Sequence, residues 1–108
     1  MNEYFDLLWE IFGLPDLSKP MKYGRMRDLL ERLCREQMRN ENPQITDLSA
    51  RINFLSAKFG LGRSEQNRLH TFRLNSTRIL NGQIEMAEDC FLSDLKTLVY
   101  FVGKIYPP

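Results

Sequence analysis

Residues 22–38 read KYGRMRDLLERLCREQM, and this stretch decides the fold. Its apolar side chains recur at steps of three and four residues, at Met26, Leu29, Leu30, Leu33, Cys34 and Met38. That spacing places them on one face of an α-helix. Opposite charges on the other face are four residues apart and can pair along the helix, Asp28 with Arg32 and Glu31 with Arg35. The stretch therefore predicts a long amphipathic helix over about residues 22–40.

The segments near the two ends of the chain are more apolar than one buried face requires. In residues 3–13, Phe5, Leu7 and Trp9 extend the apolar surface almost all the way round a predicted helix. Residues 88–105 form another predicted helix, with apolar side chains on two faces. Such a helix must lie at the centre of its bundle or be covered by another chain. We therefore expect a homodimer, or docking to downstream domains of a longer protein from which this domain is excised.

Two further helices are expected between these segments. Thr46 is the predicted N-cap of a helix that ends at Gly60, and Ser64 is the predicted N-cap of another that runs to about Leu80. No segment shows the alternation of apolar and polar residues that is typical of a half-buried β-strand. The chain has the length of one domain, so we expect a single all-α domain over residues 1–108, a bundle of about five helices.

The expected organisation has three parts: an N-terminal helix at residues 1–13, a linker at 14–21 and a bundle core at 22–106. Hydrophobic residues make up 43% of the chain, which is enough to bury a core without disulfides. Cys34 and Cys90 both occupy positions in an apolar helical period. We expect each of them to be a small core side chain rather than a ligand or a nucleophile.

Reduced cysteines of this kind are typical of a cytoplasmic protein. The N-terminus carries Glu3, Asp6 and Glu10 where a targeting sequence would need positive charge. No apolar run is long enough to cross a membrane, so no membrane partner is expected. One histidine and two separated cysteines cannot form a closed zinc site, and the chain lacks a phosphate-binding P-loop. We therefore expect no metal and no cofactor.

Charge is distributed unevenly along the chain. The net charge is +1, but residues 21–82 carry +6 and the two ends together carry −5. If the middle helices lay side by side, they could present a basic face to nucleic acid. The candidate contacts are Arg51, Lys58, Arg63, Arg68 and Arg78. The alternative is an ordinary solvated surface, because the charges alternate in sign at helical spacing.

The stretch RLHTFRLNSTRILNG, residues 68–82, contains the chain's only histidine. On a helix, Arg73, Thr77 and Asn81 are four residues apart and form one polar stripe, with His70 beside it. The neighbouring face is apolar and predicted to be buried, so the stripe lies next to the core. We expect Arg73 to brace neighbouring helices through its fork of donors.

Three stretches of the chain together resemble the HEPN superfamily, whose members are all-α nucleotide-binding and RNase domains: YGRMRDLLERLCRE, DLSARINFLSAKFGL and LHTFRLNSTRILNG. The resemblance covers about residues 20–106. It extends to an uncharacterised bacterial branch in which one helix carries Arg, then Asn four residues on, then His four residues later. The resemblance implies that, in RNase members, the Arg and the His act together on a phosphodiester with its 2′-hydroxyl.

Carried over by position, the Arg of this motif falls on Arg73, the Asn on Thr77 and the His on Asn81. An amide does not titrate near neutral pH, so Asn81 cannot shuttle a proton. The motif is therefore degenerate, and its positions are interpreted as relics that hold a seam between helices or protomers. A divergent, metal-independent RNase that pairs Arg73 with His70 is the alternative. Against it, a lone histidine near an apolar seam is more often a hydrogen-bonded structural residue.

Residues 19–38, KPMKYGRMRDLLERLCREQM, and the stretch LHTFRLNSTRILNG also resemble the N-terminal region of bacterial multidomain DNA/RNA helicases. This resemblance implies an accessory domain whose motor lies downstream, because the chain itself carries no helicase motif. The sequence thus favours a non-catalytic interaction or dimerisation domain attached to an enzyme that processes nucleic acids. A nucleic-acid-binding module and a divergent RNase are the two other hypotheses.

Overall fold

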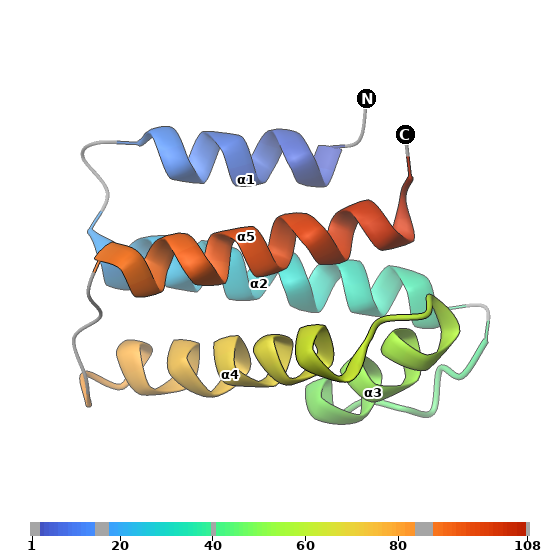
Figure 1. The fold of residues 1–108 in the computed structure, drawn as a ribbon. Coiled ribbons are helices and arrows are strands. Elements are labelled where there is room, and N and C mark those ends of the chain that lie inside the picture. The colour runs from blue at the N-terminus through green and yellow to red at the C-terminus, as the bar shows by residue number, and fades with distance from the viewer. Residues whose placement is uncertain (1–2, 15–17, 40, 84–87, 108) are drawn as a thin grey trace.

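The computed structural model describes residues 3–14, 18–39, 41–83 and 88–107, and its secondary structure consists of five α-helices (Figure 1). The helices are α1 (Glu3–Gly13), α2 (Lys19–Met38), α3 (Leu48–Lys58), α4 (Arg63–Leu80) and α5 (Glu88–Ile105). No β-strand occurs in these described ranges. The predicted single all-α bundle of five helices is confirmed.

The central element of the bundle is α2, which contacts each of the other four helices. Figure 1 shows α1, α2, α4 and α5 lying along a similar direction, with α3 at one end, where it packs on α2 and α4. Helices that follow one another in this group run in opposite directions, and α1 and α5 are also antiparallel neighbours. This arrangement surrounds α2 on several sides, and it leaves α1 with only α2 and α5 to pack against.

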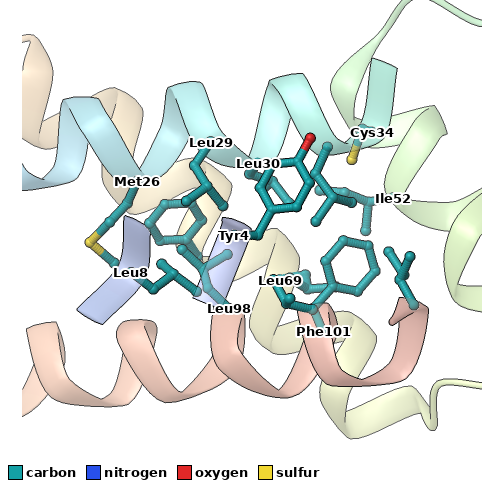
Figure 2. Close-up of a cluster of buried hydrophobic side chains, with 14 of the residues drawn as sticks. Tyr4, Leu8, Met26, Leu29, Leu30, Cys34, Ile52, Leu69, Leu98 and Phe101 are labelled. Atoms are coloured by element: carbon teal, nitrogen blue, oxygen red, sulfur yellow. The ribbon is translucent and has the colours of Figure 1, made fainter. Parts of the chain in front are cut away.

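The core confirms the apolar stripe predicted for α2. All six of its predicted members are buried, with at most 5% of their surface exposed: Met26, Leu29, Leu30, Leu33, Cys34 and Met38. Figure 2 shows side chains from all five helices meeting against this stripe. Cys90, in contrast, is exposed, so its predicted core position is wrong. Its neighbour Phe91 takes the inward position on α5, and a helix turns successive side chains about 100° apart.

The helix starts differ from those predicted. Ser18 caps α2, since its Oγ accepts a hydrogen bond from the Met21 N–H at 3.4 Å. Pro20 in the first turn is compatible with a helix start, because that turn leaves its backbone N–H groups without intrahelical partners. As a result α2 begins at Lys19 rather than at residue 22, and it takes up part of the segment predicted as a linker.

The two caps predicted for α3 and α4 are also wrong. Asp47, not Thr46, caps α3, because its carboxylate accepts the Ala50 N–H at 3.1 Å. A carboxylate there also complements the positive end of the helix dipole. Helix α4 begins after Gly62, whose carbonyl already accepts the Gln66 N–H at 3.0 Å, so Ser64 lies inside the first turn.

The first helix packs against its own bundle. Tyr4 and Leu8 are each only 1% exposed, and the Tyr4 hydroxyl donates to the Glu36 carboxylate of α2 at 2.5 Å. Arg32 of α2 reaches across to Glu3 at 2.9 Å and also pairs with Glu36 at 3.4 Å. The predicted pairing of Arg32 with Asp28 is therefore wrong, because Arg32 turns toward α1.

The other charge pair predicted on α2 also differs from the structure. Glu31 lies 3.1 Å from Arg27, which precedes it by four residues, and not beside Arg35, which follows it by four. Arg27 lies on the side of α2 that faces α4, so Glu31 turns toward that seam.

A buried polar contact joins three helices inside this apolar core. The Tyr23 hydroxyl of α2 donates to Asp94 Oδ2 of α5 at 2.5 Å, and Asn75 of α4 also hydrogen-bonds to that carboxylate. Burial raises the pKa of Asp94 above its ordinary value, while these two hydrogen bonds act in the opposite direction. Burial, followed by the hydrogen bond to Asp94, raises the pKa of Tyr23, so the phenol stays protonated as the donor.

We expect Tyr23→Phe to lower the free energy of unfolding by about 2 kcal/mol, because it leaves a buried carboxylate short of one donor. Urea denaturation followed by circular dichroism measures this change. Thr71→Val is the control, since Thr71 is exposed on α4 and its loss of a hydroxyl should cost less than about 0.5 kcal/mol. Equal effects of the two substitutions would contradict the role assigned to the Tyr23–Asp94 bond.

Candidate functional site

The predicted motif lies on α4, where Arg73 and His70 meet. Arg73 Nε donates to His70 Nδ1 at 3.4 Å, one helical turn away. Asn81 is the C-cap of α4, and its backbone N–H donates to the Thr77 carbonyl at 3.0 Å. Eight residues separate Asn81 from Arg73, which corresponds to about 12 Å along a helix. The structure thus brings together the Arg73–His70 pair of the RNase hypothesis, while Asn81 lies at the far end of the stripe.

Both ring nitrogens of His70 have partners. Nε2 lies 2.7 Å from Asn53 Oδ1 of α3, an oxygen that only accepts, so the ring proton is on Nε2. Nδ1 is then the acceptor for Arg73, and Gln66 also donates to Asn53 Oδ1 at 2.7 Å. Burial, followed by the charge of Arg73, lowers the pKa of His70 below its ordinary value. The imidazole is therefore neutral at pH 7, and its basic nitrogen is already hydrogen-bonded.

Arg27 of α2 is a site residue that the sequence analysis missed. Its Nη1 has two hydrogens to donate and lies within hydrogen-bond distance of three acceptors on α4: the Arg73 carbonyl at 2.9 Å, Ser76 Oγ at 2.8 Å and Thr77 Oγ1 at 2.7 Å. Its Nε pairs with Glu31 at 3.1 Å, which fixes the plane of the guanidinium. The expected brace between helices thus exists, but Arg27 makes it, and Arg73 contributes its backbone carbonyl.

One sequence signal could have identified Arg27. It lies directly beside Met26 at the border of the apolar stripe of α2, and Glu31 follows it by four residues. A cation at such a border, held by a carboxylate one turn away, is positioned to reach the next helix. The sequence does not say which helix that is, because the answer depends on the packing of α4 against α2.

We expect Arg27→Lys to lower the free energy of unfolding by about 1–2 kcal/mol, because an ammonium cannot reproduce the fork of a guanidinium. Arg25→Lys is the control, since Arg25 is exposed on the same helix, and it should change the free energy by less than about 0.5 kcal/mol. Thermal and urea unfolding of the two variants provide the comparison. A brace by Arg27 is contradicted if both variants are as stable as the original chain.

His70 is the chain's only histidine, so its nitrogen resonances can be assigned without ambiguity. We expect nuclear magnetic resonance to find the proton on Nε2 at pH 7 and a pKa below the ordinary value. The unfolded chain then binds a proton more readily than the folded chain, so the stability from neutral His70 is present above the ordinary pKa. It is lost as the pH falls through the lowered pKa of the folded chain.

Arg73→Gln removes the neighbouring positive charge and should raise the pKa of His70 toward the ordinary value. Arg78→Gln is the control, because Arg78 is exposed on the same helix. A proton on Nδ1, or a pKa above the ordinary value in the original chain, would contradict the hydrogen-bond assignment.

The five basic residues proposed for nucleic-acid binding differ in exposure and in their contacts. Arg51 is half-buried and donates to the Ile45 carbonyl at 2.8 Å, and Lys58 forms an ion pair with Glu41. The remaining three, Arg63, Arg68 and Arg78, are exposed on α4. At about 100° per residue, they spread over roughly 140° of the helix circumference. Two of the five candidates thus contact the chain's own groups, and the other three are exposed within one half of the α4 surface.

A hollow with a volume of about 860 Å³ lies between α1 and α5. We call it the α1/α5 groove. Its walls are formed by Phe5, Asp6, Leu8, Trp9 and Phe12 of α1 and by Leu92, Leu95, Lys96, Val99 and Tyr100 of α5. All of these except Asp6 and Lys96 are aliphatic or aromatic. The two end helices thus carry apolar surface beyond the core, as their sequences predicted.

Several large apolar side chains that line the α1/α5 groove are exposed to solvent. Trp9 is 76% exposed, and Phe12, Val99 and Tyr100 are each about 40% exposed. The rings of Trp9 and Phe12 lie 5.9 Å apart, so the two aromatic groups already contact each other. Exposed large apolar side chains concentrated in one hollow are typical of an interaction surface.

Other site chemistries find no support in the described ranges. No group of three or more His, Cys, Asp or Glu side chains there is arranged to hold a metal ion. None of the described helices is both long and apolar enough to cross a membrane. No protein family, curated protein or solved structure matches this chain. The HEPN-like resemblance therefore stays a prediction, and the site has to be interpreted from its own geometry.

Proposed function

We propose that this domain is a non-catalytic protein-interaction module whose working surface is the α1/α5 groove. The observation that carries the proposal is the apolar lining of that groove, with Trp9 mostly in water at its edge. Burial of apolar surface contributes about 25 cal/mol per Å², so covering the groove with another protein surface is strongly favourable. Trp is also one of the residue types enriched among those that dominate interface energies.

The polar contacts of α4 support a non-catalytic role. A general base must offer a lone pair to its substrate, and the Nδ1 lone pair of His70 already accepts from Arg73. Asn81 does not titrate near neutral pH, and the chain has no second histidine. The Arg73 carbonyl and Thr77 are tied to Arg27 at the seam between α2 and α4. The contacts of the Arg73 carbonyl and Thr77 with Arg27 support the role expected of motif relics, which is to hold two helices together.

The wider setting of the module follows from the resemblance to HEPN-like domains and to the N-terminal regions of bacterial helicases. On that basis the module serves a DNA/RNA helicase, or another enzyme that processes nucleic acids, as an accessory domain. Its contribution would be to hold chains together, while a motor elsewhere in the parent protein supplies the chemistry. The contacts of Arg51 with the Ile45 carbonyl and of Lys58 with Glu41 leave only three of the five basic candidates for direct nucleic-acid binding, which supports the accessory role.

A cleavage assay separates an interaction module from a ribonuclease. We expect the purified domain to leave a labelled single-stranded RNA intact, with and without a chelator, over a pH range of 5 to 8. His70→Ala combined with Arg73→Ala is the matched variant, and its product level should equal that of the original chain. Cleavage by the original chain that disappears in this variant would contradict the non-catalytic role and restore the RNase hypothesis.

A further inference from the structure

We propose that the occupant of the α1/α5 groove is the same groove of a second copy of this chain. The two copies pair about a twofold axis that runs along the groove, so that Asp6 of each copy faces the wall that carries Lys96 in the other. This inference rests on the proposed interaction function and names its partner. The apolar concentration, the shape, the charges and the helix directions of the groove each support it.

The groove holds most of the large apolar side chains that the structure shows exposed. Of seven such side chains in the described ranges, four line the groove: Trp9, Phe12, Val99 and Tyr100. The other three, Met21, Leu74 and Leu80, lie on α2 and α4. Scattered exposed apolar side chains are normal on a monomer, whereas a cluster marks one preferred contact.

An exposed aromatic side chain and a hollow occur together in the groove. A twofold interface brings the same patch of both subunits together, so the patch must hold both the projection and the cavity that receives it. Trp9 is 76% exposed and supplies the projection, and the hollow beside it has a volume of about 860 Å³. Pockets that hold bulky groups have volumes of about 300–1,000 Å³, so a ring from a second copy has room to enter.

The two charged side chains of the groove have opposite signs and lie on opposite walls. Asp6 belongs to α1 and Lys96 to α5, and within the described residues neither forms an ion pair. A groove with one charge of each sign selects neither an acidic nor a basic partner. It is complementary to itself, because a twofold axis along the groove places each α1 wall opposite the other copy's α5 wall.

The helix directions are compatible with the same pairing. In one chain α1 and α5 are antiparallel neighbours (Figure 1). A twofold axis parallel to them keeps each helix direction, so α1 of one copy also lies antiparallel to α5 of the other. The four helices then form an antiparallel bundle across the interface, a packing that helical proteins use widely.

The pairing is tested by charge reversal, with sedimentation equilibrium at low ionic strength as the measurement. We expect a dimer for the original chain and at least about tenfold weaker association for Asp6→Lys and for Lys96→Asp alone, since each creates two repulsive contacts. An equimolar mixture of the two variants should associate with an affinity close to that of the original chain. In that mixed dimer, both contacts again join opposite charges.

A second pair of variants tests the anchor. Trp9→Ser should make the chain monomeric, whereas Leu74→Ser, which removes an apolar side chain 46% exposed on α4, should leave the dimer intact. Circular dichroism of every variant checks that the helical fold is retained.

Three outcomes would overturn the inference: an original chain that stays monomeric at all concentrations, variants whose mixture fails to associate, or a dimer that survives Trp9→Ser. RNA cleavage that depends on His70 and Arg73 would instead overturn the proposed function. The two failures are therefore distinguishable.

Discussion

The burial of α2 is the constraint on which the rest of the structure depends. This helix contacts each of the other four, and its apolar stripe is almost completely withdrawn from water. Its position is also fixed by polar groups, since Tyr23 is fully buried and donates to Asp94 of α5. One helical turn further along α2, Arg27 ties the helix to the backbone of α4 at Arg73. Each of the other four helices therefore packs one face against α2. The side chains on their other faces are the ones available for binding or chemistry.

These outer faces are polar on the side of α3 and α4 and apolar on the side of α1 and α5. Toward α3 and α4, polar groups such as His70 and Asn53 satisfy one another at the surface. Toward α1 and α5, the helices have further apolar side chains and no further helix to cover them, because α1 packs only on α2 and α5. The α1/α5 groove is thus a consequence of helices whose apolar surface exceeds what one small core can hold. The functional proposal follows from this excess and not from a catalytic arrangement.

The helices and the core of α2 could be predicted because a helical period alone determines which side chains share a face. The starts of α2, α3 and α4 could not, since a cap depends on which side chain reaches a free N–H. Cys90 was misplaced because its neighbour Phe91 competes for the inward position. For the site, the apolar excess around Trp9 was visible in the sequence. A single sequence does not show which helices become neighbours. It therefore could not show that Val99 lines the groove with α1, or that Arg27 contacts α4.

The fluorescence of Trp9, recorded together with the solution mass across a dilution series, is the most direct measurement. Trp9 is the only tryptophan of the chain and lies at the edge of the groove, so its emission reports on that surface alone. If the groove is the association surface, the emission moves to shorter wavelengths as the mass doubles, with the same midpoint concentration, because the ring leaves water. A mass that doubles while the emission of Trp9 stays that of an exposed ring would place the interface elsewhere and contradict the proposal.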